Sequence, residues 1–276
     1  MSRRMLSNGD FERPSSIGTS SKHRTLMICG GTDGIGFSLL TSELVRSKYT
    51  QIFVLGRDFS RVRQLCKGGE YEILQETSQN IVEIQCDITR LDQIAVALAK
   101  IEDGHIHDFV LTIGTFVSGK IADIMPVTPG TPDGNQSSTD VVEDHFHLNC
   151  VSSIHLIRSI LPKLVDGDSQ VLTCTASLAQ RARSPYALQG ATKAALRSFV
   201  DTLRIELEGK TRVMNLMPPS VDTQIFAKAG DHRRTDGYPP PSRIAGMIQF
   251  MLDCPPDVCI PEMLVEHHSF YGSNEI

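Results

Sequence analysis

Tryptophan is absent from the 276-residue sequence, aromatic residues make up only 6% of it, and long hydrophobic runs are missing. A membrane-spanning helix needs roughly 20 consecutive apolar residues, and no run approaches that length. The formal net charge of −5 gives no sequence-wide electrostatic attraction to nucleic acid or to an anionic membrane. These absences favour a small, diffusing molecule as the partner.

The cysteines show none of the patterns that build a disulfide framework or a metal site. There are seven, an odd number, without CxxC spacing, and most sit inside apolar runs such as "LMICG" and "QVLTCTA". Cysteines of this kind are typical of small buried side chains in a reducing compartment. His267 and His268 also lack a partner at metal-binding spacing. We therefore expect a cytoplasmic protein without a metal site.

Residues 1–22 are rich in serine, arginine and glycine and have no apolar periodicity, which excludes the hydrophobic segment of a secretory signal. The arginines and serines are compatible with an organelle transit peptide, but Asp10 and Glu12 argue against one. We expect a disordered leader over 1–22, followed by a single domain over 23–270.

From Thr25 onward, short apolar runs alternate with longer amphipathic segments. The predicted strands cover residues 25–29, 51–56, 81–86, 108–114, 170–175, 212–217 and 262–266. The predicted helices cover residues 34–47, 58–67, 90–102, 142–161, 187–208 and 242–253. Continuous apolar strands separated by helices are typical of a parallel sheet covered on both faces. The sequence therefore predicts an α/β fold, a doubly wound (Rossmann) parallel sheet of about seven strands in a three-layer sandwich.

Two stretches break this alternation. Residues 126–140, "PVTPGTPDGNQSSTD", form an insert that no periodic element can use. Residues 218–241 follow the sixth strand, and ligands of open α/β sheets gather at the carboxyl ends of strands. Long connections of this kind are usually lids or binding loops, so we predict a substrate lid there. Its charged residues are candidates for reaching a substrate: Asp222, Asp231, His232, Arg233 and Arg234.

The segment "CGGTDGIGF" (29–37) joins the first strand to the first helix. Gly30 permits a tight turn, Gly34 allows the backbone to approach a phosphate, and Gly36 allows close helix packing. The helix N-terminus then faces the anion. This context predicts a nucleotide-binding turn.

The second strand ends in "LGRD", where Arg57 stands at the position of a ribose-binding acid. A guanidinium there is suited to a 2′-phosphate, which favours NADP(H) over NAD(H). Asp58 and Asp33 argue against this assignment because they bring negative charge to the same region. The alternative is that Arg57 is a solvated surface charge.

Several segments resemble the short, single-domain branch of the short-chain dehydrogenase/reductase superfamily over residues 24–266. The matching segments are "GGTDGIG" (30–36), "CDIT" (86–89), "LTIG" (111–114), "LNCVSSI" (148–154) and "NLMPPSVDT" (215–223). The chain departs from the family pattern at Cys29, which replaces a threonine, and at Pro219, which replaces a glycine.

This resemblance implies a cofactor site and an oligomer. The implied cofactor-binding residues are Gly30, Thr32, Gly34, Ile35, Gly36, Arg57, Asp87, Ile88, Gly114, Lys193, Pro218, Val221 and Thr223. The resemblance also implies a homodimer or homotetramer that associates through the helices at 142–161 and 187–208.

The family's chemistry uses a serine, a tyrosine and a lysine, with the tyrosine four residues before the lysine. Lys193 matches the lysine and Asn149 the family's helix asparagine, but Gln189 stands at the tyrosine position and Ala176 at the serine position. A glutamine amide donates a hydrogen bond to a developing oxyanion but does not give up a proton at physiological pH. The resemblance therefore implies an atypical active site.

Other side chains are candidates to replace the missing groups. Tyr186 lies nearly one helical turn before Gln189, and Ser177 and Thr175 flank Ala176. His145, His147 and His155 lie near Asn149 on one predicted helix, where a lone histidine is usually a surface or satisfied core residue.

Three functions remain open. The first is an NADPH-dependent reductase of a small organic carbonyl or iminium compound, such as a secondary metabolite, with Lys193, Gln189 and Ser177 in the site. The second is a non-redox cyclase, isomerase or dehydratase on the same scaffold. The third is a catalytically silent NADP-binding subunit.

Overall fold

The computed structural model describes residues 23–60, 63, 80–124 and 140–268. The predicted leader, the 126–140 insert except its last residue, and most of the predicted helix at 58–67 lie outside the described residues.

Seven parallel strands form one sheet in the order β3-β2-β1-β4-β5-β6-β7. The strands are β1 (Arg24–Cys29), β2 (Tyr49–Gly56), β3 (Asn80–Gln85), β4 (Asp108–Leu111), β5 (Ser169–Cys174), β6 (Thr211–Met217) and β7 (Glu262–Leu264). All residues of β1, β4 and β5 are buried, as expected for strands covered on both faces. The predicted doubly wound α/β fold is confirmed.

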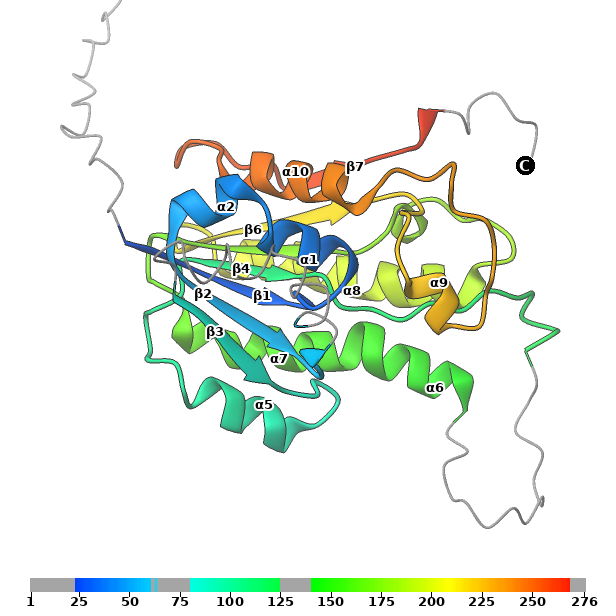
Figure 1. Cartoon of the computed structure of the whole chain (residues 1–276), viewed down its shortest axis with the longest axis horizontal. Coiled ribbons are helices and arrows are strands. Elements are labelled where there is room, and N and C mark those ends of the chain that lie inside the picture. The colour runs from blue at the N-terminus through cyan, green and yellow to red at the C-terminus, as the bar shows by residue number, and fades with distance from the viewer. Residues whose placement is uncertain (1–22, 61–62, 64–79, 125–139, 269–276) are drawn as a thin grey trace, which may run out of the picture.

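Helices cover both faces of this sheet (Figure 1). One face packs against α1 (Gly34–Leu40), α2 (Glu43–Lys48) and α10 (Pro241–Leu252). The other packs against α5 (Leu91–Leu98), α7 (Ser152–Ile160) and α8 (Ala187–Glu206).

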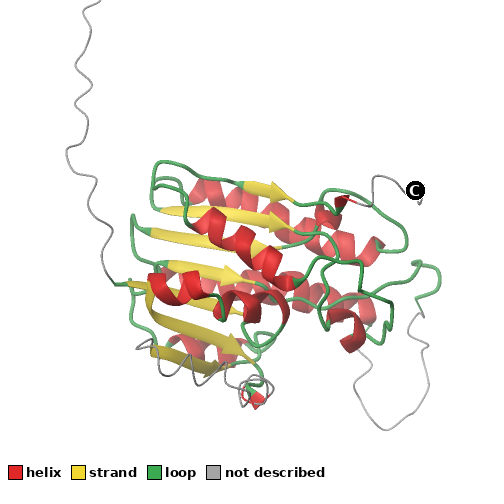
Figure 2. Ribbon diagram, turned by 45° about the horizontal axis from the view of Figure 1, so that its top comes forward, coloured by secondary structure: helices red, strands yellow, loops and turns green. Residues whose placement is uncertain are grey.

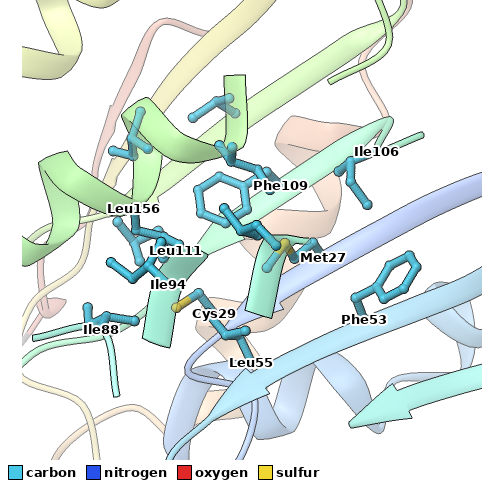
Figure 3. Packing of buried hydrophobic residues seen from close by; sticks show 14 of the residues in the cluster. Met27, Cys29, Phe53, Leu55, Ile88, Ile94, Ile106, Phe109, Leu111 and Leu156 are labelled. Atoms are coloured by element: carbon cyan, nitrogen blue, oxygen red, sulfur yellow. The ribbon is translucent and has the colours of Figure 1, made fainter. Parts of the chain in front are cut away.

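The alternation of strand side chains separates the two cores. In β1, Met27 and Cys29 belong to the core under α5, α7 and α8, whereas Leu26 and Ile28 belong to the core under α1, α2 and α10. Figure 3 shows the first of these cores, with Phe109 of β4 beside Met27. The two hydrophobic cores, one on each face of the sheet, fix the positions of the strand ends.

Two predicted helices are divided. The helix predicted at 34–47 is wrong as one element, because α1 ends at Leu40 and Ser42 caps α2 by accepting a hydrogen bond from Val45 N at 3.4 Å. The helix predicted at 142–161 begins as α6 (Val141–Phe146), continues as a π-helical turn over His147–Val151 and ends in α7.

The carboxyl ends of the strands point toward one side, where the loops after β4, β5 and β6 meet (Figure 2). The lid predicted after β6 contains the short helix α9 (Ile225–Lys228). Within the described part of the chain, no helix is both long and apolar enough to cross a membrane.

Candidate active site

The glycine-rich turn after β1 needs glycine at two positions for different reasons. Gly30 has φ +94°, a conformation that L side chains rarely adopt. A Cβ on Gly36 would lie 2.3 Å from the Gly30 carbonyl oxygen and 2.6 Å from Thr112 Oγ1. The turn therefore depends on close approach between its own first and last residues.

A cleft opens beside this turn, along the ends of β1, β2, β3 and β4. Nine of the thirteen predicted cofactor residues line it: Gly30, Thr32, Gly34, Ile35, Arg57, Asp87, Ile88, Gly114 and Thr223. Gly36 lies beneath the turn, and Lys193, Pro218 and Val221 line an adjoining pocket. These positions are suited to hold a dinucleotide that extends from Arg57 toward Lys193.

The two carboxylates that argue against a phosphate at Arg57, Asp33 and Asp58, both have hydrogen-bond partners. Asp33 accepts a hydrogen bond from Gly34 N at 2.8 Å and forms an ion pair with Lys228 of the lid at 2.5 Å. Asp58 accepts from Ser60 N and Ser60 Oγ, both at 2.7 Å. Arg57 is exposed and lines the cleft. Its guanidinium is therefore accessible to an anion, and Lys228 offsets the charge of Asp33.

A second pocket adjoins the cleft and reaches under the lid. The predicted residues Gln189, Ser177, Tyr186 and Lys193 all line it. Its remaining wall is mainly apolar and includes Ile113, Phe116, Leu178, Pro219, Ile225 and Phe226. An apolar pocket with a few convergent polar groups is the usual form of a small-molecule site.

Lys193 lines the pocket beside Gly114, a residue that lines both cavities, and is only 4% exposed. Burial lowers the pKa of its ammonium from the usual 10.5. A Cβ on Gly114 would lie 2.9 Å from Lys193 Nζ and 3.2 Å from Asn149 Oδ1. Gly114 thus leaves the space that the lysine head group occupies.

Asn149 lies behind the pocket and fixes the loop after β4. Its Oδ1 accepts from Thr115 N at 2.7 Å and its Nδ2 donates to Thr115 O at 3.1 Å. The π-helical turn contains this residue, and such turns frequently occur at functional sites. Asn149 therefore has a supporting place here and is not part of the pocket lining.

His145 is one of the three histidines that the sequence places near Asn149, and the structure brings this one against Gln189. It is 3% exposed, and its Nε2 lies 2.7 Å from Gln189 Oε1 and 3.0 Å from Asn149 Nδ2. Burial and the nearby Lys193 lower its pKa, while the hydrogen bond to Gln189 raises it, with burial dominant. The available signal was its spacing, since residues four apart share a helix face.

Tyr186 directly precedes α8 and does not belong to it. Its phenol oxygen accepts a hydrogen bond from Arg233 Nη1 at 2.9 Å. The Arg233 guanidinium carbon lies 5.0 Å from the ring centroid of Phe116, 5.6 Å from that of Tyr186 and 4.8 Å from that of Phe226. Asp231 pairs with the same guanidinium, which lowers the pKa of that carboxyl to about 2.

These contacts fasten the lid over the pocket. Phe116 comes from the loop after β4, and Ser118 from the same loop donates to Asp231 at 3.0 Å. Of the lid charges that the sequence proposed, Arg233 and Asp231 are thus placed beside the pocket. Arg234 pairs with Asp236, and His232 is exposed.

Other candidates are placed away from the chemistry. The Thr175 hydroxyl, though part of the pocket lining, donates to Asn215 Oδ1 at 2.9 Å, so it is not an unengaged donor. His147 is exposed beside Thr89 O. No group of three histidine, cysteine or acidic residues in the described part of the chain is placed to hold a metal.

Comparison of sequences finds similarity to proteins described as oxidoreductases. The chain is 24% identical over 258 residues to the uncharacterized oxidoreductase Lmo0432 of Listeria monocytogenes, covering 88% of this chain and 96% of that protein. It is 27% identical over 212 residues to the uncharacterized oxidoreductase C663.08c of Schizosaccharomyces pombe, covering 74% and 76%.

A solved structure has the same fold at low identity. The alcohol dehydrogenase of the archaeon Thermococcus sibiricus, complexed with 5-hydroxy-NADP, superposes with a TM-score of 0.72 at 19% identity and covers 89% of this chain and 97% of that one. The profile of the short chain dehydrogenase family matches residues 24–234. The chain therefore belongs to the short chain dehydrogenase family of oxidoreductases.

Proposed function

We propose that this protein is an NADPH-dependent reductase of a small, largely apolar carbonyl or iminium compound, with Gln189 at the place of the family's catalytic tyrosine. The observation that carries the proposal is the continuity of the two cavities. The cleft that Arg57 lines meets the apolar pocket at Ile113 and Gly114, which line both, and Lys193 lines the pocket beside Gly114. A bound dinucleotide would supply the hydride at this junction.

The residues of the chain fit such a cofactor. The turn around Gly30 leaves room for a close backbone approach, and Gly114 carries no Cβ where Lys193 Nζ lies. Arg57 is suited to a 2′-phosphate, since guanidinium–phosphate pairs are frequently bidentate. Thr223 faces the turn from the lid side, with its Cγ2 3.2 Å from the position of a Gly34 Cβ.

On this proposal the protein's groups orient the substrate and stabilise charge. Gln189 and Ser177 offer hydrogen bonds at the polar end of the pocket, and Phe116 of the loop after β4 and Phe226 of the lid exclude water. The Gln189 amide does not give up a proton at physiological pH, so on this proposal the proton of the product comes from water or from the substrate itself.

Titration of NADPH and NADH by cofactor fluorescence tests the cofactor assignment. An exposed charge-assisted contact contributes roughly 1.5 kcal/mol, so Arg57→Ala should weaken NADPH binding about tenfold and leave NADH binding unchanged. Arg90→Ala is the matched control, because Arg90 is exposed and pairs with Asp92 outside the cleft. Equal loss for both cofactors would contradict the role of Arg57.

Single-turnover mixing with NADPH and candidate ketones or iminium compounds, followed at the near-UV absorbance of the cofactor, tests the reaction. We expect oxidation of NADPH by at least one apolar compound. Product formation with NADPH unconsumed would indicate non-redox chemistry on the same scaffold.

A further inference from the structure

A buried histidine, His145, lies behind the polar end of the pocket and has no role in the reaction proposed above. His145 of α6 and Gln189 of α8 are 3% and 5% exposed, and they meet through His145 Nε2 and Gln189 Oε1 at 2.7 Å. Gln189 also lines the pocket. His145 therefore contacts the amide oxygen of Gln189, a side chain that also lines the substrate pocket.

Two groups compete for the same histidine nitrogen. Asn149 Nδ2 lies 3.0 Å from His145 Nε2, and in a neutral imidazole each nitrogen is either a donor or an acceptor. Asn149 has other partners, since its Nδ2 donates to Thr115 O at 3.1 Å and lies 3.4 Å from Thr192 Oγ1. In the described part of the chain, Gln189 Oε1 forms its hydrogen bond with His145.

This difference decides which proton position is favoured. A buried carbonyl oxygen without a donor loses the hydrogen bond it had in water, whereas Asn149 keeps two bonds to Thr115 whatever the histidine does. The tautomer with the proton on Nε2 satisfies Gln189, whereas Asn149 gives up its bond to His145 Nε2 and keeps its two bonds to Thr115. It also fixes the Gln189 amide with its oxygen toward His145.

We propose that His145 is a positioning residue that donates its Nε2 proton to Gln189 Oε1 and so turns the Gln189 NH2 group into the pocket as a hydrogen-bond donor. The substrate atom that fits a fixed donor is an oxygen with a lone pair. An iminium nitrogen has no lone pair, and its charge gains nothing from an N–H donor beside Lys193. Resting on the proposed reductase function, this narrows the substrate class to carbonyl compounds.

The tautomer is measurable without any substrate. In the full-length ¹⁵N-labelled protein, long-range proton–nitrogen correlation distinguishes protonated from bare ring nitrogens, and the His145→Gln spectrum identifies the signals of His145. We expect the proton on Nε2 and a bare Nδ1 at neutral pH. A proton on Nδ1 with a bare Nε2 would overturn the proposal, because Gln189 would then have to turn its NH2 group toward the histidine.

Kinetics test the consequence with two named probes, 9,10-phenanthrenequinone as a planar dicarbonyl and N-methyl-3,4-dihydroisoquinolinium as a cyclic iminium. His145→Phe keeps a ring but loses the donor, whereas His145→Gln keeps a donor of similar reach. We expect His145→Phe to lower kcat for the quinone about tenfold or more with little change in KM, as for loss of an oriented donor. His145→Gln should restore most of it.

His147→Phe is the matched control, because His147 lies on the same segment but is exposed; we expect wild-type kinetics. Unchanged quinone kinetics in a folded, NADPH-binding His145→Phe variant would refute the positioning role, as would faster reduction of the iminium than of the quinone. If the wild-type protein oxidises NADPH with neither probe nor any other compound, the reductase function fails, and the tautomer measurement still decides the orientation of Gln189.

Discussion

Replacement of Gly36 by alanine tests whether the turn after β1 depends on close backbone approach. The added Cβ would lie 2.3 Å from the oxygen and 2.8 Å from the carbon of Gly30, and 2.6 Å from Thr112 Oγ1. Two of these three atoms belong to the backbone of a residue at φ +94°, so they have little freedom to move. The turn itself has to shift.

The magnitude follows from two opposing effects. Overpacking costs about 1–3 kcal/mol, and backbone contacts place this site at the upper end. Alanine is favoured over glycine inside a helix by roughly 1 kcal/mol. The net loss is about 2 kcal/mol, which lowers Tm by about 4–8 °C in a domain of this size. Because the shifted backbone of Gly30 lines the cofactor cleft, NADPH affinity should fall about tenfold or more.

Gly246→Ala is the matched control. Gly246 lies in the middle of α10, is exposed, and a Cβ there meets nothing within 4 Å. Only the helix preference of alanine remains, so Tm should rise by about 2–4 °C and NADPH affinity should stay the same. Thermal unfolding with and without NADPH measures both variants. Wild-type Tm and NADPH affinity in Gly36→Ala would refute the reasoning.

Two further perturbations address the lid and the buried histidine. Arg233→Ala removes cation–π contacts to three rings, each worth about 0.5–1 kcal/mol. Amide hydrogen exchange over residues 222–238 should therefore become about tenfold faster or more. Arg234→Ala is the control and should leave the exchange rates unchanged, because the Arg234 side chain is 87% exposed. Stability should fall as the pH drops below 6.5, because burial lowers the pKa of His145 in the folded protein and the unfolded chain takes up the proton first. Thermal unfolding between about pH 5 and 7 should show a smaller dependence of Tm on pH in His145→Gln than in the wild-type protein. An equal dependence would contradict a neutral, buried His145.

The positions of the strands along the chain and the nucleotide-binding turn could be predicted from local patterns. Apolar runs indicate the strands because a parallel sheet is buried on both faces, and Gly30, Gly34 and Gly36 indicate the turn because they lie between the first strand and the first helix. The break at Ser42 escaped prediction because a single capping hydrogen bond, to Val45 N, competes there with helix continuation.

The polar end of the pocket was harder to predict because its contacts join distant parts of the chain. His145 and Gln189 are 44 residues apart and Tyr186 and Arg233 are 47 apart, so no local spacing relates them. The sequence treated the three histidines near Asn149 alike, as surface or satisfied core residues, whereas the structure buries His145 and exposes His147. The π-helical turn begins at His147, two residues after His145. Because its periodicity differs from that of an α-helix, an α-helical wheel does not predict which side of the helix the following residues face.

The proposed donor role of Gln189 separates two tasks that one tyrosine would combine. Hydrogen bonding to the substrate oxygen stabilises the charge that develops there, but an amide keeps its proton, so protonation has to occur from another direction. Tyr186 lines the same pocket, and its oxygen accepts a hydrogen bond from Arg233, which leaves the phenol hydrogen directed away from the guanidinium. On the reductase proposal, charge stabilisation therefore belongs to α8 and its backing histidine, while access of the proton depends on the lid that Arg233 holds in place.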